Sequence, residues 1–178
     1  MKNNTTNFLM KECITKSLLL LLHEKPLDAI SVLEIVGKAG VNRSTYYRHF
    51  QTKQAVIRYY YRCRLDACLQ TASEARSLER YFTEIFTSFW QHKDELILLE
   101  DRSLSYLLLE EMNSRLSCAE TDPVRLLYLN YHFGGVFNSF RYWLNSGMTI
   151  PPEVLARQCV AILPEDFTPS LYGPKTKS

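Results

Sequence analysis

The sequence predicts an all-α protein. Its 178 residues, of which 46% are hydrophobic and 22% charged, supply enough apolar material for a core and do not resemble a disordered chain. Apolar residues recur at helical spacing in most segments, and no segment stands out with the alternation of a half-buried strand. Residues that start or stop helices separate these segments. These three observations indicate helices packed on helices.

The first helix is expected over about residues 6–23, with Pro26 at or after its end. Its spacing predicts an inward face made of Phe8, Ile14, Leu18, Leu21 and Leu22.

A second, short helix is expected over residues 32–39. Ser31 and Glu34 have the spacing of a capping box, in which each residue satisfies a backbone N–H group of the other. Gly40 can adopt the left-handed conformation that stops a helix.

A third helix is expected over residues 43–49, with Asn42 as its N-cap. It carries two arginines, a histidine, a serine, a threonine and two tyrosines, and it has no aliphatic residue. A helix so rich in hydrogen-bond donors has little use in a core. It suits the major groove of DNA, where base edges and phosphates need such groups.

The stretch from about residue 7 to residue 64 resembles the DNA-binding domain of the TetR/AcrR family of transcriptional repressors. The resemblance rests on the apolar first helix, the turn Ala39-Gly40-Val41, the block S-T-Y-Y-R-H-F over 44–50 and the helix start Thr52-Lys53. It implies an N-terminal three-helix helix-turn-helix DNA-binding domain over residues 7–65. A C-terminal helical dimerisation and effector domain would follow over 66–163, and a flexible tail over 164–178.

Base contacts are expected from residues 43–45, at the helix end that faces base edges in helix-turn-helix docking. Arg43 suits guanine, and Thr45 suits a phosphate or a thymine methyl group. The complete set of DNA-binding candidates is Ser31, Arg43, Ser44, Thr45, Tyr47, Arg48, His49 and Lys53.

Phosphate contacts fall, by the resemblance, on Tyr47, His49 and Lys53. Lys53 also lies in the first turn of the next helix, where the free N–H groups favour anions. The charge distribution agrees, because residues 1–65 carry 11 Lys and Arg against 4 Asp and Glu, whereas residues 66–178 carry 10 against 15.

Thr52 is expected to cap a long fourth helix that reaches about Ser73 and connects the basic region to the acidic one. Its predicted apolar stripe is Val56, Tyr60, Cys63 and Ala67. A fifth helix over 78–92 presents Phe82, Phe86, Phe89 and Trp90 on one face. This face serves either as core or as the ligand-binding wall of an apolar effector pocket.

Shorter helices are expected near 94–99 and 104–116. Asp122-Pro123 then starts a helix over 124–145, which Gly147 ends, and Pro151-Pro152 opens a last helix to about residue 163. The helix over 124–145 is apolar on several sides, so we expect it to be buried in a homodimer. The interface candidates are Phe133, Gly134, Phe137, Phe140, Arg141 and Leu144.

Several classes are disfavoured. No nucleophile elbow, phosphate loop or dinucleotide fingerprint occurs, so the sequence does not indicate an enzyme or a cofactor. The five cysteines have no C-x-x-C pair, and no histidine has metal spacing, so no metal site is expected. The aliphatic run over 18–22 is too short to cross a membrane, and we expect a cytoplasmic protein.

The sequence therefore predicts a homodimeric transcriptional repressor that binds double-stranded operator DNA and is released by a small apolar effector. Two alternatives stay open. One is a regulator or co-activator that is controlled by a protein partner, and the other is an interaction module that kept the fold but lost DNA binding.

Overall fold

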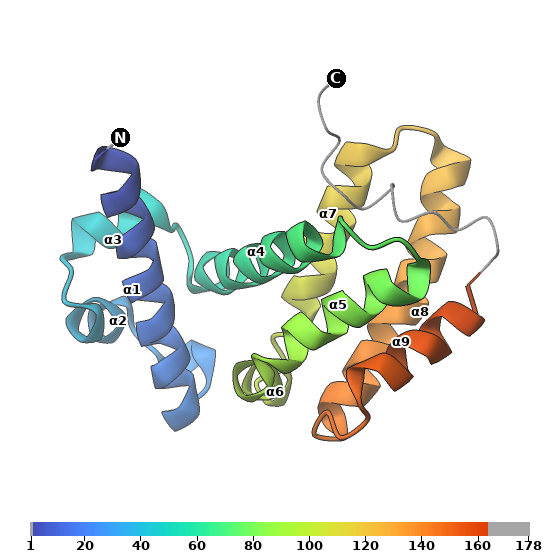
Figure 1. The fold of residues 1–178 in the computed structure, drawn as a ribbon. Helices are drawn as coiled ribbons and strands as arrows, with labels where there is room; N and C mark the ends of the chain where they lie inside the picture. Colours follow the sequence, from blue (N-terminus) through green and yellow to red (C-terminus); the bar gives the residue numbers. More distant parts are fainter. Residues whose placement is uncertain (1, 164–178) are drawn as a thin grey trace.

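The computed structural model describes the backbone of residues 2–163 and the side chains of residues 6–115 and 120–163. This part of the chain consists of α-helices and one short 3-10 helix, without strands, which confirms the all-α prediction (Figure 1). None of its helices is both long enough and apolar enough to cross a membrane. The predicted flexible tail, 164–178, lies outside the described residues.

The first three α-helices form a compact group that we call the head. It comprises α1 (Lys2–Glu24), η1 (Leu27–Ala29), α2 (Val32–Ala39) and α3 (Arg43–His49). The side of α1 that faces α2, α3 and α4 is buried, at Ile14, Leu18, Leu21 and Leu22. The prediction that Phe8 faces inward is wrong, because its side chain is 53% exposed. The buried residues of α1 begin only at Ile14, so its first turns extend beyond the helices that cover it.

The helix boundaries of the head come from the capping residues that the sequence indicated. The Ser31 N–H donates to the Glu34 carboxylate at 2.9 Å, and the Glu34 N–H donates to the Ser31 hydroxyl at 3.3 Å. Gly40 has φ 66, in the left-handed region that glycine adopts without strain. The Asn42 side chain accepts from the Thr45 N–H at 2.8 Å. The predicted bounds of α2 and α3 are confirmed.

Helix α4 (Lys53–Ala72) crosses from the head to the remaining helices (Figure 1). The Thr52 hydroxyl caps it by accepting from the Ala55 N–H at 3.1 Å. The predicted stripe is buried at Val56 and Tyr60, but Ala67 is exposed. Helix α4 packs first on α1 and then on α5 and α7, so its buried side changes along its length.

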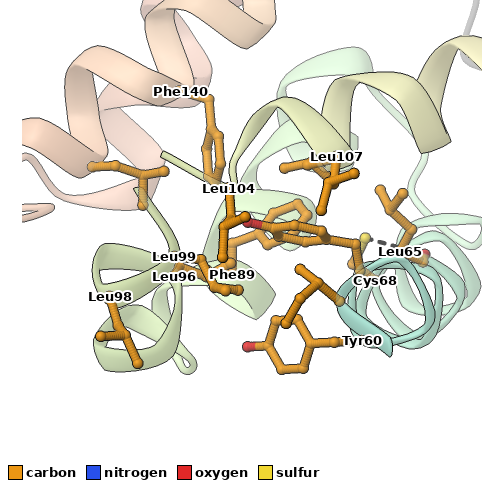
Figure 2. Packing of buried hydrophobic residues seen from close by; sticks show 14 of the residues in the cluster. Tyr60, Leu65, Cys68, Phe89, Leu96, Leu98, Leu99, Leu104, Leu107 and Phe140 are labelled. Atoms are coloured by element: carbon orange, nitrogen blue, oxygen red, sulfur yellow. Dashed lines mark hydrogen bonds between the residues drawn. The ribbon is translucent and has the colours of Figure 1, made fainter. Parts of the chain in front are cut away.

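The remaining helices form a second group that we call the body. Its helices are α5 (Leu78–Trp90), α6 (Lys93–Asp101), α7 (Tyr106–Ala119), α8 (Pro123–Asn145) and α9 (Pro152–Ala161). Helix α5 lies between α4 and α9, and α7 lies between α4 and α8. Figure 2 shows how Phe89 of α5, Phe140 of α8 and leucines of α6 and α7 form one apolar cluster with Tyr60 and Leu65 of α4.

The starts and ends of helices α8 and α9 also lie at the residues that the sequence indicated. The Asp122 carboxylate accepts from the Val124 N–H at 3.0 Å, with Pro123 as the first residue of α8. Gly147, with φ 72, lies just beyond the end of α8, and Pro152 is the first residue of α9.

Candidate DNA-binding surface

Helix α3 is fixed to the head by one side and exposes the other. Tyr46 is fully buried, and its ring lies 5.3 Å from the Tyr47 ring and 6.2 Å from the Phe50 ring. Phe50, directly after the helix, is 4% exposed. These two buried aromatics orient the helix so that Arg43, Tyr47 and Arg48 face outward.

Arg43 and Tyr47 lie together on this outer side. The Arg43 guanidinium is 5.7 Å from the centroid of the Tyr47 ring, within the range of a cation–π contact. Tyr47 is 49% exposed. The contact restricts Arg43 at the N-terminal turn of α3, which is the end that meets base edges in helix-turn-helix docking.

Ser44 and Thr45 are oriented by the helix cap. Asn42 Oδ1 accepts from the Ser44 hydroxyl at 2.7 Å and from the Thr45 N–H at 2.8 Å. Ser44 is exposed and Thr45 half-buried. Asn42 therefore fixes the conformation of this turn, and it is not among the predicted DNA-binding residues.

His49 is half-buried at the end of α3. Burial and the nearby cations Lys11 and Arg48 hold the pKa of His49 below its ordinary value. The imidazole is therefore neutral near pH 7, and it can serve a phosphate as a neutral N–H donor but not as a cation.

Lys53 has backbone partners in the head. Its ammonium donates to the carbonyl oxygens of Leu27 at 2.6 Å, Asp28 at 3.3 Å and Ile30 at 2.7 Å. A lysine ammonium has three donors, so these contacts occupy all of them. In this structure Lys53 connects the start of α4 to the chain between α1 and α2.

Ser31 is equally engaged, as the cap of α2. Its hydroxyl donates to the Glu34 carboxylate at 2.8 Å and accepts from the Glu34 N–H. The residue as a whole is exposed.

Part of the positive charge counted for residues 1–65 is directed toward the body. Arg58 forms an ion pair with Glu110, and Arg62 pairs with Glu111 at 3.0 Å. One turn further along α4, Asp66 pairs with Arg115 at 2.8 Å. These three pairs hold α4 along α7, and they leave less positive charge for a polyanion than the sequence count indicates.

An exposed, arginine-bearing helix on a three-helix head is the arrangement of a helix-turn-helix DNA-binding domain. Residues 14–60 match the family model described as bacterial regulatory proteins of the tetR family. The match runs from the buried part of α1 into the first half of α4, and it identifies this region as a DNA-binding domain of the tetR type. A search of curated proteins found no match to this chain.

The aromatic residues of α5 divide into two groups. Phe82, Phe86 and Phe89 are buried. The ring centroid of Phe86 lies 5.9 Å from that of Trp143, and the centroid of Phe89 lies 5.1 Å from that of Phe140.

Trp90 is different, since it is 42% exposed and lines an open hollow of about 410 Å³ between the start of α6 and the connection from α8 to α9. Its indole N–H donates to the Met148 carbonyl at 3.3 Å, and the Lys93 ammonium lies 5.5 Å from its ring centroid.

The expected dimer residues on α8 need a correction. Phe137, Phe140 and Leu144 are at most 5% exposed within the single chain, because their side of α8 faces the body's own core. Gly134 and Phe133 are half-buried, and Arg141 pairs with Glu100.

The opposite side of α8 carries the exposed apolar residues, and we call it the α8 stripe. It consists of Val124 (75% exposed), Leu127 (73%), Tyr131 (78%) and Tyr142 (69%). Gly135 lies on the same side, with open space where a Cβ would be. The sequence predicts α8, but its periodicity does not distinguish the buried apolar side from the exposed one.

Proposed function

We propose that the protein is a cytoplasmic, homodimeric transcriptional repressor, and that α3 reads an operator in the DNA major groove. The observation that carries the proposal is the exposed Arg43, Tyr47 and Arg48 on a helix that buried Tyr46 orients. Arg43 would read guanine, while Tyr47 and neutral His49 would contact phosphates. The boundary between DNA-binding and dimerisation domains, near residue 65, belongs to this proposal, and it falls inside α4.

The α8 stripe supports the homodimer. Four large apolar side chains, each at least 69% exposed, lie along one side of a single helix. Burying them against the same stripe of a second copy would remove this apolar area from water. Gly135, in the middle of the stripe, would let the two helices approach closely, as a two-fold interface requires.

Release by an effector is the second part of the proposal. Because three ion pairs hold α4 along α7, a shift within the body would move α4 with it. The separation of the two heads would change, and operator affinity would fall by a population shift. Phe82, Phe86 and Phe89 already fill the core, so an apolar effector would displace core contacts or bind near Trp90 instead.

The test of DNA binding is a selection from a random pool of double-stranded DNA. The proposal predicts enrichment of an inverted repeat whose half-site centres lie about 10 base pairs, or a multiple, apart. Enrichment of no sequence would favour an interaction module without DNA binding. If a sequence is enriched but only a protein fraction of a cell extract releases the regulator from that DNA, the regulator is controlled by a protein partner.

A further inference from the structure

The last turn of α1 and the chain that follows it are held by two cations from distant parts of the molecule. Lys53, at the start of α4, donates to carbonyls within residues 27–30. Arg102, at the end of α6, donates from Nε to the Leu22 carbonyl at 2.7 Å and from Nη2 to the His23 carbonyl at 3.2 Å. The first contact comes from the helix that follows the head, and the second comes from the body.

The chemistry of the Arg102 contact is specific. Leu22 and His23 belong to the last turn of α1, whose carbonyl oxygens have no partner within the helix. This is also the negative end of the helix dipole. The two-pronged guanidinium meets both oxygens at once, which a lysine cannot reproduce with the same geometry.

The backbone around Arg102 is fixed by an abrupt helix end. The Arg102 N–H donates to the Leu98 carbonyl, and Ser103, with φ 57, takes the left-handed conformation. The Ser103 N–H then donates to the Glu100 carbonyl and the Leu104 N–H to the Leu99 carbonyl, both at 2.8 Å. The left-handed residue and these two bonds close the end of α6, so the direction of Arg102 depends on the position of α6.

Helix α6 is in turn attached to α8. The carboxylate of Glu100, 5% exposed, accepts from Arg141 Nη2 at 2.6 Å and from Arg141 Nε at 3.0 Å. Asn145 Nδ2 adds a contact at 3.3 Å. Burial is the largest single influence and raises the pKa of Glu100. The hydrogen bonds from Arg141, Ser105 and Asn145 and the Arg141 charge together outweigh it and lower the net pKa, so the pair stays charged. Arg102 and Glu100 therefore connect the end of α1 to the helix that carries the α8 stripe.

The contact of Arg102 with α1 attaches the head to the body at a second point and so restricts the orientation of the head. The only covalent connection is the short segment over residues 50–52 into α4. Helix α4 also packs on α1 and is bonded through Lys53 to the chain between α1 and α2, but these contacts all belong to one helix. Contact of α6 with the end of α1 adds a second, separate point of attachment, and two separated points define the orientation of the head relative to the body (Figure 1).

We propose that Arg102 is a positioning residue for operator recognition. By holding the end of α1 against α6, it sets the orientation of each α3 relative to the dimer helix, and hence the spacing between the two recognition helices. This inference rests on the proposed function, since it assumes a dimer that binds two half-sites.

The experiment compares three proteins on one set of DNA duplexes. Wild type, Arg102→Ala and the control Arg80→Ala are titrated by fluorescence anisotropy with the selected operator and with versions whose half-sites are about 5 base pairs, or half a helical turn, further apart. A duplex with a single half-site reports on the head alone. Arg80 is a suitable control because it is an exposed arginine on α5 whose one ion pair within the described residues is with Glu84.

For wild type and Arg80→Ala, the altered spacing should weaken binding on the order of 100-fold, because the second head no longer reaches its half-site. For Arg102→Ala the same change should weaken binding about tenfold or less, while affinity for the single half-site stays unchanged. Arg102→Lys should fall between the two, since it keeps the charge but loses the two-pronged geometry.

A spacing preference in Arg102→Ala as sharp as in wild type overturns the inference. Loss of single half-site binding in that variant also overturns it, because Arg102 would then maintain the fold of the head and not its orientation. Failure of the wild type to bind any duplex would instead remove the proposed function itself.

Discussion

At the residue scale, Lys53 shows how one side chain supports two interpretations. Its position at the start of α4 predicts a phosphate ligand, whereas the structure gives its ammonium three carbonyl partners within the head. If the structural role dominates, Lys53→Ala should lower the free energy of unfolding by about 1.5–3 kcal/mol, the value of hydrogen bonds to a charged group. Urea unfolding measures this directly.

Lys38→Ala is the matched control, because within the part of the chain that the structure describes Lys38 makes only a long, exposed ion pair with Glu24 at 3.7 Å. Its unfolding free energy should change by less than about 1 kcal/mol. The structural interpretation fails if Lys53→Ala is as stable as this control and merely reduces the salt slope of DNA binding by about one unit.

Arg43 is expected to act on base preference and not on stability. It is exposed and contacts only the Tyr47 ring among the described contacts. Arg43→Ala should relax preference at one position of each half-site, at a cost of about 1–3 kcal/mol for a lost bidentate contact. Repeating the selection from a random pool with this variant tests it. An unchanged consensus would show that Arg43 does not read a base.

The capping box of α2 predicts a pH dependence. The hydrogen bond from Lys25, followed by those from the Ser31 backbone and hydroxyl, lowers the pKa of Glu34 from 4.5 to about 2. Because the pKa is lower in the folded state, this stabilisation is present above about pH 4.5 and is lost as the pH falls toward 2. The melting temperatures of wild type and Glu34→Gln should differ at neutral pH and converge over this range. A constant difference would mean that the carboxylate charge is not involved.

At the scale of the elements, the head could be predicted almost completely and the body only in part. Ser31, Gly40, Asn42 and Thr52 define helix ends through contacts with residues at most four positions away, so the sequence alone contains that information. The partners of Lys53 lie 23–26 residues away, and those of Arg102 lie 79–80 residues away, so no local sequence pattern predicts them.

Helix α8 shows the same limit. Aromatic and aliphatic residues occur on both of its sides, so periodicity cannot tell Phe137, 5% exposed, from Tyr131, 78% exposed. Only the packing of the body decides which side is core and which remains for a partner.

This distinction between the two sides gives a paired prediction. Tyr131→Glu should yield a folded monomer, because its charge would lie in the proposed interface yet face water in the single chain. Phe137→Glu should fail to fold, since it buries an unpaired charge in the core. Multi-angle light scattering and circular dichroism separate these outcomes. A dimeric Tyr131→Glu protein would place the interface elsewhere.

The ion pair between α6 and α8 should also matter for stability. Arg141→Ala would leave the buried carboxylate of Glu100 with only Asn145 and Ser105 as partners. The expected loss in the free energy of unfolding is about 1–3 kcal/mol. It lies below that of a fully buried pair because the Arg141 side chain is 47% exposed. A loss below about 0.5 kcal/mol in urea unfolding would show that solvent replaces the pair.

At the scale of the whole molecule, the structure couples a DNA-binding head to a helical body through α4 and through Arg102. The ion pairs of α4 with α7 and of α6 with α8 join these contacts to the helix that carries the α8 stripe. A change within the body would thus reach the head by two routes, which suits a regulator whose DNA affinity responds to a signal.

The central claim is that the exposed side of α3 binds DNA. Its most direct test is the dissociation constant of wild type and of the Arg43/Tyr47/Arg48 triple-alanine variant for the selected operator, measured over a series of salt concentrations. We expect a steep salt dependence for wild type and a loss of about 10³-fold or more in the variant, with the wild-type helical content and dimer mass retained. Equal dissociation constants for the two proteins would contradict it.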